Sequence, residues 1–132
     1  MKNLLISAII FFFILGSAIF LHTKLITICD TALLISDKIE TSLSSEDFEE
    51  AYNESISLYS LINDKYTLIS LYINHEEIDF LNTEVLELSQ FTKTKNPSDA
   101  LASLHTVKSS LVHLKEIEKL NIGNILFSNL KI

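Results

Sequence analysis

The sequence contains no Arg and no Trp, and it has only one Cys, one Pro and two Gly in 132 residues. All ten of its basic residues are Lys, so the chain has no guanidinium group that could hold a phosphate through two parallel hydrogen bonds. Against these ten stand 17 acidic residues, which give a net charge of −7. Because an acidic surface repels DNA and RNA, the composition argues against nucleic acid as a partner.

The scarcity of Cys and Gly argues against further classes of protein. A single Cys cannot build a disulfide framework or a thiolate metal cluster within the chain. Two Gly residues cannot supply a phosphate-cradling loop, and neither the G-x-G-x-x-G nor the G-x-x-x-x-G-K pattern occurs. We therefore do not expect a nucleotide-dependent enzyme, and we expect no cofactor.

One long apolar run is present near the N-terminus. Residues 4–21 read LLISAIIFFFILGSAIFL, in which 15 of 18 residues are apolar and none is charged. A helix of this length reaches the lower part of the range that spans the hydrocarbon core of a bilayer. We expect residues 1–23 to form a transmembrane anchor or signal-like segment that contacts lipid through residues 4–21. Residues 24–132 are then a helical bundle domain.

A cleaved secretory signal is the alternative interpretation of this run. Lys2 would then form the basic region, residues 4–15 the apolar region and residues 16–18 the cleavage site, and a secreted helical protein would result. The apolar residues continue to Leu21, which favours an uncleaved anchor. Because the short N-terminal flank carries Lys2 and the terminal amine, the positive-inside tendency favours a cytoplasmic N-terminus. We expect a single-pass protein of the cell membrane with an extracytoplasmic body.

The pattern beyond the apolar run is helical. Apolar residues recur every three or four positions from Leu21 to Leu43 without Gly or Pro, which predicts one helix over residues 4–43. Residues 44–47 read SSED and predict a stop and a restart, with a Ser cap and acidic residues in the new first turn. The next helix carries a wide apolar face over residues 48–73, which suits a bundle interior.

Capping patterns predict two further helices. Asn74 can cap a third helix, and Asn96 followed by Pro97 begins a fourth. We expect the fourth helix to end at Gly123 in a left-handed cap and residues 124–127 to lie back on the bundle. The predicted fold is all-α, with an N-terminal transmembrane helix that continues into an antiparallel bundle of three to four helices.

Residues 75–79 are the strongest candidate for chemistry. Their H-E-x-x-D pattern differs by one residue from the H-E-x-x-H of zinc peptidases, with His75 and Asp79 as ligands and Glu76 as general base. A zinc site needs a third protein ligand, and no partner motif follows. Acidic residues also gather in first helical turns because the helix dipole favours them. A metal-dependent hydrolase is an alternative, whereas the main hypothesis is a non-enzymatic protein without a metal.

The remaining polar candidates indicate a surface for binding rather than a reactive site. His105 and His113 are eight positions apart on the predicted fourth helix, roughly on the same side but too far apart to share one ion. Cys29 is expected to be a packed thiol. The apolar stripe of the first helix also permits a homodimer. The candidate interaction surface consists of His75, Asp79, His105, His113, Asn121 and Asn124.

Four segments together resemble a small family of single-span proteins from anaerobic spore-forming bacteria, whose domain has no assigned function. These segments are INHEEID at residues 73–79, DALASLH at 99–105, HLKEI at 113–117 and LNIGNIL at 120–126. The chain departs from the family's pattern at Gly123 and Leu126, where a bulkier polar residue and Phe are usual. The family is similar to products encoded beside other small membrane proteins, and this implies another membrane protein as partner.

The residues and the resemblance together lead to one expectation. The chain should be a membrane-anchored extracytoplasmic bundle that acts, without catalysis, as an interaction protein or as an accessory subunit of an envelope membrane complex.

Overall fold

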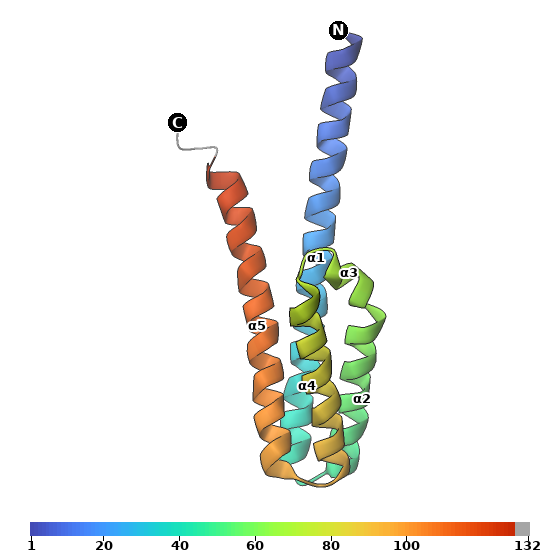
Figure 1. The fold of residues 1–132 in the computed structure, drawn as a ribbon, viewed down its shortest axis with the longest axis vertical. Coiled ribbons are helices and arrows are strands. Elements are labelled where there is room, and N and C mark those ends of the chain that lie inside the picture. The colour runs from blue at the N-terminus through green and yellow to red at the C-terminus, as the bar shows by residue number, and fades with distance from the viewer. Residues whose placement is uncertain (129–132) are drawn as a thin grey trace.

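A computed structural model describes residues 1–128, apart from the side chains of residues 121, 122 and 124–128. All regular structure in the described range is helical: α1 (Lys2–Ser44), α2 (Phe48–Asp64), α3 (Tyr66–Ser70), α4 (His75–Lys93) and α5 (Pro97–Ser128). The four long helices pack in the order α1, α2, α4, α5, and α5 closes the ring against α1 (Figure 1). The predicted all-α bundle is confirmed.

Helix α1 belongs to the bundle along only part of its length. It is a single helix of 43 residues, as its pattern predicts, and at 1.5 Å per residue it is about 64 Å long. Its N-terminal apolar stretch has no buried residue and projects from one end of the bundle (Figure 1). We call this end the proximal end. The opposite, distal end holds the α1–α2 and α4–α5 turns.

The core lies between the four long helices. Each helix contributes residues at spacings of three and four, and burial of one such Leu or Ile side chain contributes about 1.5–3 kcal/mol. The apolar residues with no exposed surface are Ala32, Ile39, Ala51, Leu58, Ile78, Val85, Leu88, Ala100, Leu104 and Val107.

The second helix ends earlier than the sequence predicts. The pattern indicates one helix over residues 48–73, but α2 ends at Asp64, and the short α3 and a turn follow. The break lets Ile69 and Ile73 pack over the proximal end of the core, where both are buried. Because the spacing of three and four runs through the break, the apolar pattern alone could not locate it.

The first connection also differs in detail. Ser45 is the C-cap of α1 and Glu46 takes a left-handed conformation with φ 59°, so the N-cap of α2 is Asp47 and not a Ser. The Asp47 side chain accepts a hydrogen bond from the backbone N–H of Glu50 at 3.1 Å. At the start of α4 the predicted cap is confirmed, because the Asn74 side chain accepts from the backbone N–H of Glu76.

The prediction for the end of α5 is wrong. Helix α5 continues through Gly123 to Ser128, and Gly123 does not adopt a positive φ. A Gly inside a helix costs about 1 kcal/mol relative to Ala but does not stop it when the following residues can remain helical. Residues 124–127 therefore extend α5 instead of lying back on the bundle, and α5 runs past the proximal ends of α2 and α4 (Figure 1).

The Asp47 cap gives a test of this connection. We expect Asp47→Ala to lower the free energy of unfolding by about 1 kcal/mol, because the Glu50 N–H loses its acceptor. Ser44→Ala is the matched control, since the exposed Ser44 hydroxyl bonds only within its own helix, and its effect should stay within about 0.5 kcal/mol. Urea unfolding of the full chain in detergent measures both, and equal effects would contradict the assigned cap.

Candidate interaction surfaces

A row of ion pairs joins α1 to α5. The Lys108 ammonium lies 2.7 Å from Asp37 Oδ1 and 2.6 Å from Glu40 Oε2, and Lys115 pairs with Asp30. Hydrogen bonds to Asp37 and Glu40 raise the pKa of Lys108, and the hydrogen bond from Lys108 lowers the pKa of Glu40. The later residue of α5, Lys115, pairs with the earlier residue of α1, Asp30, so these contacts fix an antiparallel register. We call this row the α1–α5 seam.

The seam reaches the proximal end through a pair between His22 and Glu118. His22 Nδ1 lies 3.2 Å from Glu118 Oε2, and the Glu118 residue is only 5% exposed. Tyr72, in the α3–α4 turn, is near the same carboxylate, and burial followed by the Glu118 charge raises the pKa of its phenol. Helices α1 and α5 and the α3–α4 turn therefore meet at one level.

His105 lies at the α1–α5 seam. Its Nε2 atom lies 3.5 Å from Glu40 Oε1, on the side of α5 that faces α1. The other candidates on α5 are placed differently. His113 lines a groove against α4, while the side chains of Asn121 and Asn124 lie outside the described residues.

Two of the sequence-derived candidates are held together by a third residue. The Tyr66 hydroxyl donates to Asp79 Oδ1 at 2.9 Å and lies 3.4 Å from His75 Nδ1, and the Tyr66 and His75 rings stack with centroids 6.2 Å apart. The Asp79 hydrogen bond raises the pKa of Tyr66. Tyr66 lies nine positions before His75 in the sequence and on a different helix, so no spacing within one helix signals its contact with Asp79.

The same cluster bears on the hydrolase alternative. In the part of the chain whose side chains are described, no three His, Cys, Asp or Glu residues come close enough together to hold a metal ion. Asp79 and His75 both face the Tyr66 hydroxyl. This arrangement is a hydrogen-bonded surface cluster that ties α3 to the first turns of α4.

A groove between α4 and α5 lies next to this cluster. It encloses about 300 Å³, and the exposed ring of Phe80 and the acidic side chains of the first turn of α4 stand opposite His113 of α5. The groove thus combines an apolar wall with negative charge. Its lining residues are Glu76, Glu77, Phe80, Ser110, His113 and Leu114.

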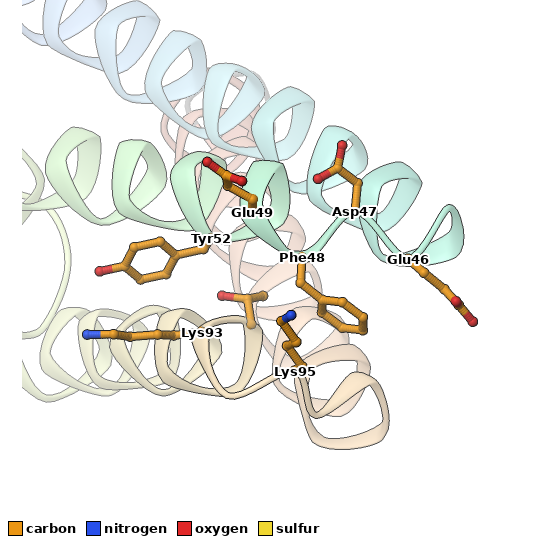
Figure 2. Close-up of a pocket in the computed structure, with 8 residues that line it drawn as sticks. Glu46, Asp47, Phe48, Glu49, Tyr52, Lys93 and Lys95 are labelled. Atoms are coloured by element: carbon orange, nitrogen blue, oxygen red, sulfur yellow. The ribbon is translucent and has the colours of Figure 1, made fainter.

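A second groove, at the distal end, was not anticipated from the sequence. Figure 2 shows Glu46 and Asp47 of the α1–α2 connection with Glu49 of α2 on one side, and Lys93 and Lys95 on the other. Its volume is about 370 Å³. Only the fold brings these segments together, because they are more than 40 positions apart in the sequence.

Backbone strain and charge describe this distal groove further. Lys95 has φ 56°, as Glu46 has φ 59°, and a left-handed conformation costs a non-Gly residue about 1 kcal/mol or more. The Lys93 ammonium lies 5.8 Å from the centroid of the Tyr52 ring. The residues that line the groove include both acidic and basic ones, so it offers no charge of a single sign to a ligand.

These features define a helical bundle that carries one long apolar helix. The family described as Domain of unknown function (DUF4363) matches residues 19–125, and the chain belongs to this family. The resemblance drawn from the sequence is therefore confirmed at the level of a domain of unknown function. A search of curated proteins and a search of solved structures each gave no match.

Cys29 gives a test of the packing between α1 and the bundle. Cys29 is buried, and this burial raises the pKa of its thiol to about 11. At pH 8 such a thiol is ionised to on the order of one part in a thousand, against about a quarter for an ordinary Cys. We expect the folded chain to react with maleimide at least about a hundredfold more slowly than the unfolded chain, as followed by mass spectrometry. Equal rates would contradict the packing.

Proposed function

We propose that this protein is a single-pass membrane protein whose bundle lies outside the cytoplasm and binds another protein of the envelope without catalysing a reaction. In this role it is an accessory subunit of a membrane complex. The proposal assigns three tasks to three parts of the chain. The apolar part of α1 anchors the protein, the α1–α5 seam holds the bundle to the anchor, and the α4–α5 groove receives the partner.

The exposed apolar stretch of α1 is the observation that carries this proposal. Of the helices in residues 1–128, α1 alone is long and apolar enough to cross a membrane, and its apolar window has no buried residue. A soluble protein rarely exposes so large an apolar surface, and in lipid a helix satisfies its own backbone hydrogen bonds. A bilayer around residues 4–21 removes this surface from water.

The orientation is supported by charge. Lys2 stands in the short flank before the apolar stretch, whereas Lys24 follows the stretch and leads into the long acidic body of the chain. Lys and Arg favour the cytoplasmic side when they lie in short flanking segments, and the charges of long segments have little influence. The N-terminal flank is therefore assigned to the cytoplasm, and the bundle to the outside.

The α4–α5 groove is the surface best suited to a protein partner. Phe80 is 50% exposed at its wall, and aromatic side chains at the edge of a pocket are typical anchors of protein interfaces. Glu76 and Glu77 beside it favour a partner segment that offers a cation next to an apolar side chain. The Tyr66–His75–Asp79 cluster lies at the start of the same helix and extends this surface.

Topology can be tested with single introduced thiols. In intact cells we expect Ser57→Cys, an exposed position of α2, to react with a membrane-impermeant maleimide, because the bundle lies outside. Asn3→Cys, an exposed position that leaves Lys2 in place, should react only after lysis, and the buried native Cys29 should stay silent in both cases. The reverse labelling pattern would place the bundle inside the cell. An intact mass that starts after residue 18 would instead establish the secreted alternative.

The groove can be tested by matched changes on one helix. We expect Phe80→Asp to weaken co-purification of a stoichiometric envelope partner at least about tenfold, since loss of an aromatic anchor costs about 2 kcal/mol or more. Leu86→Asp is the control, because Leu86 is 44% exposed on the same helix and does not line the groove. Quantitative mass spectrometry of mild-detergent extracts measures both, and equal retention or equal loss would contradict the groove as the docking surface.

A further inference from the structure

Helix α5 extends past the level of Leu21, the end of the apolar stretch of α1 that lies nearest the bundle. Glu118 contacts His22, and His22 directly follows the apolar run of residues 4–21. Because the two helices are antiparallel, the residues after Glu118 rise to the level of positions of α1 before His22. Figure 1 shows α5 continuing beyond the ends of α2 and α4 on the same side of the bundle as the N-terminal part of α1, while leaning away from it. At 1.5 Å per residue, residues 119–128 add about 15 Å of helix.

The composition of the chain changes at the same point. Glu118 is the last acidic residue, and residues 119–132 read KLNIGNILFSNLKI, with two Lys and seven apolar residues. The chain as a whole has a net charge of −7. A segment that combines apolar residues with Lys, and that lacks acidic residues, is typical of helices that lie at the boundary between lipid headgroups and acyl chains.

Other residues at the proximal end are exposed and apolar. Leu71, in the α3–α4 turn, is 68% exposed, and Leu120, two positions after Glu118, is 66% exposed. Tyr72 of the same turn is partly buried and packs against the core. At the proximal end, the α3–α4 turn and α5 therefore each present an exposed apolar side chain near the point where the apolar stretch of α1 meets the bundle.

We infer that residues 119–128 of α5 pass through the headgroup region into the bilayer and form a second membrane contact beside the anchor, with Leu71 at the bilayer surface. This inference rests on the proposed function, because it requires that residues 4–21 cross the membrane. The register of α5 against α1 favours lipid as the surroundings of residues 119–128. If α1 spans the bilayer up to Leu21, a helix fixed to His22 and directed toward the same bilayer reaches its surface.

A tryptophan scan tests this contact, because the natural sequence has no Trp. Phe127→Trp places one fluorophore near the end of α5, Phe13→Trp places one in the anchor, and Phe48→Trp places one at the distal end. Each full-length variant is reconstituted into phosphatidylcholine vesicles, with the acyl chains brominated either near the headgroup or near the chain terminus. We expect Trp at 127 and Trp at 13 both to be quenched by the brominated chains, because each lies nine residues beyond the contact between Glu118 and His22, and Trp at 48 to be quenched by neither set of bromines.

Each other outcome overturns a defined part of the account. Quenching at position 13 without quenching at 127 would overturn the lipid contact of α5 and leave the anchor intact. Blue-shifted but unquenched emission at 127 would mean burial against protein, in a second copy or a partner, and would also overturn it. The absence of quenching at both positions would overturn the anchor, and with it the proposed function. A second variant, Ile125→Trp, must repeat the result at 127.

Discussion

The structure depends on the continuity of the backbone hydrogen bonds of α1. A helix satisfies its own N–H and C=O groups, so it can pass from hydrocarbon into a protein core without leaving polar groups unpaired at the boundary. In α1 the exposed apolar stretch and the buried face that begins at Leu25 belong to the same 43-residue helix. The bundle is therefore joined to the apolar stretch by a continuous helix and not by a flexible linker.

The α1–α5 seam fixes the position of α5 relative to the continuous helix α1. Its ion pairs run from Glu40 near the distal end to His22 at the proximal end, and Lys108 bridges Asp37 and Glu40. Partly exposed pairs of this kind contribute little stability each, about 1 kcal/mol or less. Their main effect is to set register, because a shift of α5 along α1 would separate every pair. That register fixes where the end of α5 lies relative to the apolar stretch.

Sequence reasoning recovered most of the fold, since apolar residues spaced by three and four mark the buried faces from Leu25 to Leu114. It failed where the physical signal is local or absent. The break at Lys65 interrupts no apolar spacing, the cap moved from Ser to Asp47 because Ser45 and Glu46 close α1, and Gly123 stays helical.

The site was less predictable than the fold, because it depends on contacts between distant segments. Sequence spacing put His75 and Asp79 on one face of a helix, but it could not show that the Tyr66 hydroxyl lies between them. The structure also separates His105 and His113, which the sequence places roughly on the same side of one helix: His105 faces α1 and His113 faces α4. An eight-residue spacing alone does not reveal which neighbouring helix each side chain meets.

A distance measurement along α1 in a bilayer tests the central claim most directly. Spin labels at Ile14, in the apolar stretch, and at Lys38, on the exposed face of the bundle part, are 24 residues apart on one helix. For the full chain in lipid nanodiscs, pulsed electron paramagnetic resonance should give one narrow distribution near about 36 Å, the rise of an unbroken helix. A much shorter distance or a broad distribution would show that the helix breaks between membrane and bundle, and would contradict the account.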